Sequence, residues 1–535
     1  MEILILLLCL SIATIGSAQQ PKPHIIFILA DDLGYNDVGF HGSNQIPTPN
    51  IDALAYTGII LDNYYVAPVC TPTRAAIMTG KYPIHTGMQH SVILGSTPYG
   101  LGLNEKLLPQ YLKINGYTTR AIGKWHLGHF RKEYTPEFRG FDSHYGYWLG
   151  RQDYYDHSSM DANLFWGYDF KRGLNSSWDD YANYSTDLYT EEAVKIIREH
   201  DTSKPLFLYM AYQAVHSGNI YNHLQAPPEV IDKFSYIKDE NRRKFAGMLS
   251  AMDYSIGEII SALSERDILD NAIIVFSTDN GGPAAGFDDN AASNWPLRGV
   301  KATLWQGGVK AAGFIWSPLL PSGVISKGLM HAADWLPTLL HAATGKDPLL
   351  TRIDGQDMWK TFSDSQPSGR NEVLLNIDPI EKLSGLIHRN WKLVKGRARG
   401  GDWDKWYGPS ARDEEYNWAA LWACKAAKSL NSILPLPAKT AIEKLRQEAS
   451  LSCNSAALES QTDDNSTEYV YLFDISKDPC ETHNLANTER ARLDMMNAIL
   501  QKYMEGMAKP RNKKSDPRSH PKYFGYQWVN WMDYM

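Results

Sequence analysis

Long apolar runs are scarce in this sequence, and the one that stands out, Ile3 to Ile12, is too short to span a bilayer comfortably. No later stretch approaches that length, so neither a transmembrane helix nor a membrane anchor is expected. Positive charge is not in excess, since the formal net charge is −7, and nothing suggests nucleic acid or an anionic membrane as a partner. The sequence also lacks internal repeats, low-complexity tracts, and a C-terminal retention signal or lipid-anchor tail.

Residues 1–18 are predicted to be a secretory signal peptide, because the apolar run leads to a small-residue cleavage site, Gly16-Ser17-Ala18. The residues before the run lack the Lys or Arg that such signals usually carry. Asn-x-Ser/Thr sequons at Asn175, Asn183 and Asn465 fit N-glycosylation in the secretory pathway. We therefore expect a lysosomal or exported glycoprotein.

The length of 535 residues is too great for one ordinary core, while 43% hydrophobic and 21% charged residues are typical of a soluble globular protein. The first part of the chain alternates strand and helix patterns, which favours an α/β sheet with helices on both faces. After about residue 385, short antiparallel strands are expected at Leu386–His388, Trp391–Lys395 and Val470–Phe473, with a helix at Arg490–Met507. We predict a first domain at 19–385 and a smaller α+β domain at 386–535.

Four apolar strand patterns in the first part of the chain each lead to a polar cluster. They are His24–Ala30 before Asp31 and Asp32, Tyr117–Ile122 before Lys124 and His126, Pro205–Met210 before His216, and Ala272–Ser277 before Asp279 and Asn280. Such runs suit buried parallel strands, and ligands bind at the carboxyl ends of these strands. The four clusters are therefore expected to converge on one crevice. Helix patterns lie between the strands, at Asn104–Asn115, Thr186–His200, Arg242–Leu263 and Trp335–Thr344.

The stretch from Val69 to Gly80, Val-Cys-Thr-Pro-Thr-Arg-Ala-Ala-Ile-Met-Thr-Gly, predicts a helix that begins near Cys70. Pro72 suits the first turn, Thr71 and Thr73 can accept from free N–H groups there, and Gly80 suits the end. Cys70 would then face the positive end of the helix dipole, with the Arg74 cation one turn away. A lone cysteine is more often a buried structural residue, but this spacing is more particular.

Cys-x-Pro-x-Arg, followed by Ala-Ala-Ile-Met-Thr-Gly-Lys-Tyr-Pro, resembles the signature of the type I sulfatases. The resemblance covers essentially the whole mature chain and points to the arylsulfatase B (N-acetylgalactosamine-4-sulfatase) group, with arylsulfatases I and J. Further matching blocks include Asn294-Trp-Pro-Leu-Arg-Gly299 and Asp334-Trp-Leu-Pro-Thr-Leu339. It implies an alkaline-phosphatase-like fold with a mixed, mostly parallel sheet. It also implies that a formylglycine-generating enzyme oxidises Cys70 to formylglycine, whose hydrated aldehyde is the nucleophile.

Oxygen donors without histidine or thiolate neighbours are offered by Asp31, Asp32, Asp279 and Asn280. Such a set favours Ca²⁺ or Mg²⁺ over zinc, although a single acidic pair is more often a solvated turn or helix cap. The resemblance assigns these four residues and the modified Cys70 to one divalent cation, usually calcium.

The resemblance places Arg74, Lys124, His126, His216 and Lys301 at active-site positions. It implies that Arg74 steadies and, with the metal, activates the hydrated aldehyde. His216 and Lys301 bind sulfate and protonate the leaving oxygen. His126 takes the proton of the second hydroxyl while Lys124 stabilises the hydrate. A hydrated aldehyde suits this task because one hydroxyl attacks sulfur and the other expels sulfate as the C=O re-forms.

The cysteines and one loop depart from the family pattern. Tyr134 stands where vertebrate members carry a cysteine, in a loop expected to border the substrate pocket. Two substrate classes therefore stay open: sulfated galactosamine glycans such as N-acetylgalactosamine 4-sulfate, and dietary or plant metabolites such as glucosinolates. If Cys70 is converted, Cys424, Cys453 and Cys480 permit one disulfide, and Cys480 is an expected member because it lies in a predicted turn.

Three other functions are considered. A phosphatase or phosphodiesterase of the same superfamily would use Ser or Thr and two zinc ions, which Cys70 and the histidine-poor metal set argue against. A catalytically silent secreted binding protein is disfavoured because every expected catalytic residue is present. A cysteine hydrolase would leave the carboxylate cluster without a role.

Overall fold

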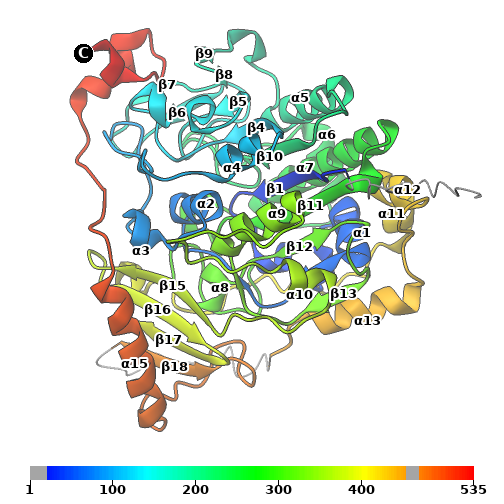
Figure 1. The fold of residues 1–535 in the computed structure, drawn as a ribbon, viewed down its shortest axis with the longest axis vertical. Coiled ribbons are helices and arrows are strands. Elements are labelled where there is room, and N and C mark those ends of the chain that lie inside the picture. Colours follow the sequence, from blue (N-terminus) through cyan, green and yellow to red (C-terminus); the bar gives the residue numbers. More distant parts are fainter. Residues whose placement is uncertain (1–20, 454–468) are drawn as a thin grey trace, which may run out of the picture.

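The computed structural model describes residues 21–453 and 469–535, so the predicted signal peptide and Asn465 lie outside the described residues. Its centre is a ten-stranded sheet in the order β13-β2-β12-β11-β1-β10-β4-β5-β8-β9 (Figure 1). Strands β11, β1, β10, β4 and β5 run parallel to one another, and β12, β8 and β9 are antiparallel to their neighbours. The expected mixed, mostly parallel sheet is confirmed. The strands are β1 (His24–Ala30), β2 (Ile59–Leu61), β4 (Thr118–Lys124), β5 (Ser143–Tyr147), β8 (Lys171–Arg172), β9 (Asn175–Ser176), β10 (Leu206–Ala211), β11 (Ala272–Thr278), β12 (Gly313–Trp316) and β13 (Val324–Ser326).

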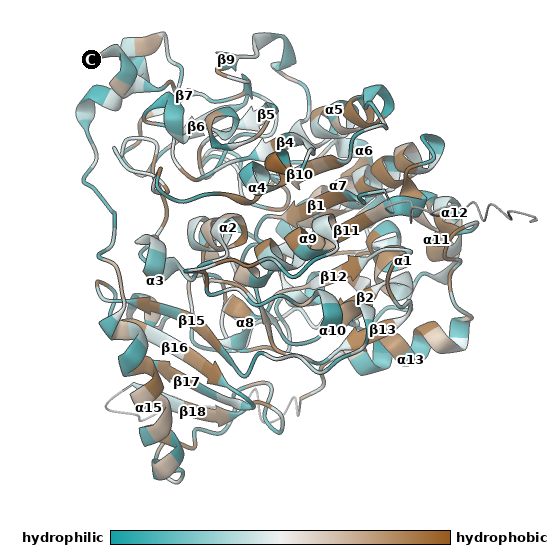
Figure 2. Cartoon of the chain, viewed as in Figure 1, coloured by the Kyte–Doolittle hydropathy of each residue, from teal (hydrophilic) through white to brown (hydrophobic). Residues whose placement is uncertain are grey.

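Helices cover both faces of this sheet. Successive side chains along a buried strand point to opposite faces, so each face carries apolar residues that must be covered. In β1, Ile26 and Ile28 join the apolar cluster of α1 (Pro49–Thr57), α5 (Ser185–Glu199) and α7 (Glu240–Glu265). Phe27 and Leu29 join the opposite cluster with α2 (Cys70–Thr79), α4 (Leu108–Ile114) and α9 (Trp335–Thr344). Figure 2 shows the resulting concentration of apolar residues on the central strands.

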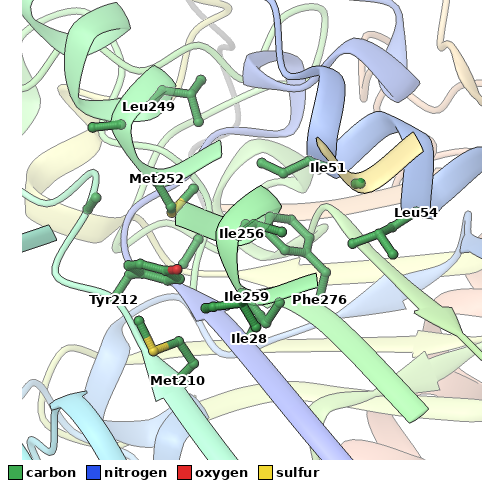
Figure 3. Packing of buried hydrophobic residues seen from close by; sticks show 14 of the residues in the cluster. Ile28, Ile51, Leu54, Met210, Tyr212, Leu249, Met252, Ile256, Ile259 and Phe276 are labelled. Carbon is green, nitrogen blue, oxygen red and sulfur yellow. The ribbon is translucent and has the colours of Figure 1, made fainter. Parts of the chain in front are cut away.

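Helix α7 packs on the sheet through the apolar face that its sequence pattern predicts. Its apolar residues recur every three or four positions and therefore share one helix face. Met252, Ile256 and Ile259 lie on this face, against Ile28 and Met210 of the sheet (Figure 3). Full burial of one such side chain is worth about 1.5–3 kcal/mol. Within the described residues, no helix is both long enough and apolar enough to cross a membrane.

A smaller antiparallel sheet contains β15 (Glu372–Asp378), β16 (Leu383–His388), β17 (Trp391–Lys395) and β18 (Val470–Asp474). Helix α15 (Arg490–Glu505) packs against it (Figure 1). The sheet was expected, but its first strand, β15, begins before residue 385. The disulfide joins Cys453 to Cys480, which confirms Cys480 as a member, and Cys424 is free.

The chain after residue 385 also returns to the large sheet at two places. Helices α11 (Trp418–Ala423), α12 (Lys425–Leu430) and α13 (Lys439–Ala449) contribute Leu421, Leu430 and Ile442 to the cluster beneath α1 and α7. The C-terminal segment runs from α15 up to β6 (Ser158–Met160) and β7 (Trp166–Tyr168), where Trp528 is buried (Figure 1). The division into domains at residue 385 stays a prediction, and these contacts tie both parts together.

Candidate active site

The polar clusters that follow β1, β10 and β11 lie side by side. The backbone N–H of Asp31 donates to the carbonyl of Ala214 over 3.0 Å, and that of Asp279 donates to Ala30 over 3.2 Å. These bonds fix the three loops to one another at the carboxyl ends of neighbouring strands. All ten predicted catalytic and metal-binding residues are no more than 5% exposed: Asp31, Asp32, Cys70, Arg74, Lys124, His126, His216, Asp279, Asn280 and Lys301.

Cys70 is the first residue of α2, as its sequence pattern predicted, and Gly80 ends this helix in the left-handed region with φ 67°. The expectation that Thr71 and Thr73 cap the helix is wrong. Thr73 instead accepts from the N–H of Ala67, and Thr71 donates to the carbonyl of His126. Tertiary contacts thus take both hydroxyls, which leaves the N-terminal N–H groups of α2 near position 70 for an anionic ligand.

Cations and carboxylates alternate beneath Cys70. The Nε of Arg74 donates to Asp279 Oδ2 over 2.9 Å, and Lys124 Nζ donates to Asp31 Oδ2 over 2.7 Å. Lys301 Nζ donates to Asp32 Oδ2 over 2.8 Å. Each of these buried charges therefore has a counter-charge, which is the condition for keeping it ionised away from water.

Two buried oxygen atoms in this network have no hydrogen-bond partner among the described residues: Asp31 Oδ1 and Asn280 Oδ1. The amide of Asn280 is oriented by its Nδ2, which donates to Asp32 Oδ1 over 2.7 Å. Burial and the charge of Asp279 raise the pKa of Asp31 well above its usual range. Carboxylate and amide oxygens that lack partners fit a hard divalent cation, which would also offset the acidic charge. The residues present thus fit the expected metal.

The imidazole of His126 faces Cys70. Its Nδ1 lies 3.2 Å from Cys70 Sγ, and its Nε2 lies 3.0 Å from the carbonyl oxygen of Ile93. Since only a protonated Nε2 can donate to Ile93, we assign the lone pair to Nδ1. Burial, together with Lys124 and Arg74, holds the pKa of His126 well below its usual range.

Burial raises the pKa of the Cys70 thiol to about 11. The thiol therefore stays protonated at neutral pH, and a protonated thiol is a poor nucleophile. This argues against an unmodified cysteine hydrolase.

His216 and Lys301 form a second reactive pair. Lys301 Nζ lies 3.2 Å from His216 Nε2, while His216 Nδ1 lies 2.7 Å from the carbonyl oxygen of Ser217. Burial, Lys301, Lys124 and Arg151 hold the pKa of His216 well below its usual range. The neutral imidazole can thus accept a proton or hydrogen bond from the Lys301 ammonium.

A cavity of about 370 Å³ opens over this network, and Cys70, His126, His216 and Lys301 all line it. Four charged lining residues were not predicted: Arg151, Asp161, Asp288 and Arg399. Asp288 Oδ2 accepts from Lys301 Nζ over 3.0 Å. No sequence motif marks these four, because they lie in loops and short helical turns whose positions depend on tertiary contacts. Elsewhere, the sequon residues Asn175 and Asn183 are exposed, as glycosylation requires.

Comparisons with known proteins agree with this geometry. The family described as Sulfatase matches residues 23–346. Arylsulfatase J of Mus musculus is 40% identical over 519 residues, covering 96% of this chain and 81% of the relative. N-acetylgalactosamine-6-sulfatase of Mus musculus is 31% identical over 397 residues, covering 69% of this chain and 71% of the relative.

The crystal structure of Ps i-CgsB has a TM-score of 0.71 to this chain at 26% identity, with 92% of this chain and 94% of that one covered. Its complex with k-i-k-neocarrahexaose has a TM-score of 0.70 at 27% identity, with 96% and 98% covered. A sulfatase from Pseudoalteromonas sp., PsFucS1, shares the fold with a TM-score of 0.64 at 22% identity. The expected resemblance and the alkaline-phosphatase-like fold are confirmed, and the chain belongs to the sulfatase family of enzymes.

Proposed function

We propose that this sulfatase releases inorganic sulfate from sulfated sugars by means of a formylglycine at position 70 and one Ca²⁺ ion. The observation that carries the proposal is the position of Cys70: it begins α2 on the cavity wall, 3.2 Å from the basic nitrogen of His126. A buried, protonated thiol at position 70 is a poor nucleophile, so oxidation to the aldehyde would supply the nucleophile that the site lacks. A formylglycine-generating enzyme is thus a proposed partner during synthesis.

The metal would be held by Asp31, Asp32, Asp279, Asn280 and the modified side chain at position 70. When bound, it would neutralise charge on the sulfuryl oxygens and lower the pKa of a hydroxyl at position 70. The partnerless oxygens of Asp31 and Asn280 support this assignment. Arg74 orients Asp279 through its Nε and places a permanent cation beneath the nucleophile.

Proton transfer is assigned to two separate groups. The Nδ1 of His126 is aimed at position 70 and can accept the proton of its second hydroxyl when sulfate is expelled. Lys301, hydrogen-bonded to His216, can donate the proton that the leaving oxygen requires. Lys124 stabilises the hydrate. General acid or base catalysis of this kind typically contributes about 10²–10⁴-fold to the rate.

The proposed substrate is a sulfated sugar such as an N-acetylgalactosamine 4-sulfate glycan. Two comparisons support a sugar: one relative is named N-acetylgalactosamine-6-sulfatase, and Ps i-CgsB was crystallised with k-i-k-neocarrahexaose. A glucosinolate sulfatase is the alternative. We further propose that the protein is secreted or lysosomal, with N-glycans at Asn175, Asn183 and Asn465.

Sulfate release from four esters tests this function: N-acetylgalactosamine 4-sulfate, the 6-sulfate isomer, a glucosinolate and an aryl sulfate. Turnover of the 4-sulfate above its isomer and the glucosinolate is expected. Preference for the glucosinolate would replace the proposed substrate, and absence of turnover on all four would refute the function.

A further inference from the structure

Two arginines that line the cavity, Arg151 and Arg399, form no ion pair with its other charged residues. Of the acidic side chains that line the cavity, Asp288 pairs with Lys301, as described above. Asp161 accepts hydrogen bonds from backbone N–H groups, those of Ser96, Asn163 and Phe165. Neither carboxylate forms an ion pair with Arg151 or Arg399, and within residues 21–453 and 469–535 no carboxylate lies at ion-pair distance from either arginine, although the charge of Arg151 contributes to lowering the pKa of Asp288.

The cations deeper in the site are already committed. Arg74 bonds Asp279, Lys124 bonds Asp31, and Lys301 is shared by two carboxylates. The charges of these cations and carboxylates, taken together, match what one bound sulfate ester and one metal ion require. The positive charges of Arg151 and Arg399 are not needed to balance the sulfate ester and the metal ion, so they are available for another group of the substrate.

The two arginines reach the cavity from separate parts of the chain. Arg151 follows β5 in the loop that leads to β6, and Arg399 lies in the short helical turn after β17. The guanidinium of Arg399 stacks over the ring of Phe287 at 4.7 Å, which holds it beside the cavity without using its N–H donors. A guanidinium with free donors in a partly enclosed cavity binds a carboxylate or sulfate by paired, charge-assisted hydrogen bonds.

We propose that the substrate carries a second oxyanion besides the sulfate ester that is cleaved, and that Arg151 and Arg399 bind it. The second oxyanion is a carboxylate of a neighbouring uronic acid or a second sulfate on the saccharide. This inference rests on the proposed function and narrows it to acidic sulfated saccharides. A metabolite with one sulfate and no other charge, such as a glucosinolate, would leave both guanidinium groups without a partner.

Three disaccharides that share the same scissile sulfate test the inference. The first has a uronic acid next to the sulfated sugar, the second has that carboxylate reduced to an alcohol, and the third is the reduced form with a second sulfate. An aryl sulfate serves as a small reference ester. The enzymes are the wild type, Arg151→Gln and Arg399→Gln, with kcat and KM measured separately.

Arg389→Gln is a matched control for Arg399→Gln. Arg389 is also an exposed arginine with positive φ, 54° against 47° for Arg399, but it precedes β17 whereas Arg399 follows it. It does not line the cavity.

We expect the wild type to favour one or both doubly charged disaccharides over the neutral form by about tenfold or more in kcat/KM, mainly through KM, since a hydrogen bond to a charged group is typically worth that much. Each arginine substitution should reduce this ratio, and Arg389→Gln should not. Preference for the uronate or for the second sulfate identifies which oxyanion is bound. Equal turnover of all three disaccharides, or an unchanged ratio in both variants, would overturn the inference while aryl sulfate turnover upholds the function. Failure on every ester would instead refute the function itself.

Discussion

The Sγ atom of Cys70 lies 3.2 Å from Nδ1 of His126, the nitrogen that we assign as unprotonated. This pair links the start of a helix to the end of a buried strand, since α2 begins at Cys70 and β4 ends two residues before His126. Position 70 thus has the unprotonated nitrogen of His126 beside it, which is the base that the proposed release of sulfate requires.

Replacement of the proposed nucleophile should abolish catalysis without unfolding the protein. Cys70→Ala removes one sulfur atom from a buried site, so we expect loss of sulfate release with the thermal unfolding midpoint lowered by only a few degrees, because deletion of one such atom costs on the order of 1 kcal/mol. Cys424→Ala is the matched control: this second buried, free cysteine is remote from the cavity, and its loss should leave turnover intact. Mass spectrometry of the peptide that contains position 70 should show the aldehyde, and a wholly unmodified thiol in active enzyme would contradict the mechanism.

Calcium should bind the folded protein in a way that depends on Asn280. Its partnerless Oδ1 is one of the oxygens that the ion would take, so Asn280→Ala should weaken binding. In chelator-treated wild-type protein, added Ca²⁺ should raise the unfolding midpoint, since a ligand at a hundredfold its Kd stabilises by about 2.7 kcal/mol. The variant should need a higher Ca²⁺ concentration for the same shift. An identical titration for both proteins would remove Asn280 from the metal site.

The pH profile of kcat/KM should have its acid limb below pH 6.5. Burial and neighbouring cations lower the pKa of both His126 and His216, so both imidazoles stay neutral as the pH falls past the usual histidine value. The charges of Asp32 and Asp288 raise the pKa of Lys301 against the effect of its burial, so this residue keeps its proton at alkaline pH. On the acid side, we therefore expect kcat/KM to fall only below pH 6.5, and on the alkaline side only where Lys301 loses its proton.

Asp288→Asn tests the alkaline side of the same profile. It removes one of the two carboxylates that favour charged Lys301, and the alkaline limb should therefore move to lower pH. An alkaline limb at the same pH in the variant and the wild type would show that the loss of activity at alkaline pH does not come from deprotonation of Lys301.

Two glycines with similar backbone angles should respond very differently to alanine. Gly123 and Gly116 have φ of +90° and +86°, so either substitution incurs left-handed strain of about 1–2 kcal/mol. At Gly123 a Cβ would also lie 1.9 Å from the carbonyl oxygen of Ala211, whereas at Gly116 it would meet nothing within 4 Å. Gly123→Ala should thus lower the unfolding midpoint clearly more than Gly116→Ala. Equal midpoints would mean that β4 and β10 can separate at little cost.

The sequence predicted the central strands because they are apolar, short and followed at once by polar residues. β1 has the predicted bounds, and β4, β10 and β11 differ from theirs by one or two residues. Helix α4 begins at Leu108 rather than Asn104, because Pro109 favours the first turn of a helix. The ten site residues were predicted from strand ends and from the resemblance to the sulfatases; the structure brings them together, and their catalytic and metal-binding roles stay predictions.

Other features depend on long-range contacts and were missed. Nothing local distinguishes Arg151 or Arg399 from any exposed arginine, and only the folded loops bring them to one cavity. The hydroxyls of Thr71 and Thr73 looked like helix caps, but Thr71 bonds His126 from a distant part of the chain and Thr73 bonds Ala67 in the preceding loop. Strand β15 was missed because the predicted change of architecture was placed at residue 385, after its end.

The ring of Trp528, near the end of the chain, backs Gly95, where a Cβ would lie 2.8 Å from it, and its Nε1 donates to the carbonyl of Ser159 over 2.8 Å. Gly95 and Ser159 both line the cavity beside Cys70, which is itself only 2% exposed. The wall around position 70 is therefore complete only once Trp528, from a distant part of the sequence, has packed against it. Under the proposed mechanism, oxidation of this buried thiol would therefore be favoured before Trp528 docks, while position 70 is still open to a modifying enzyme.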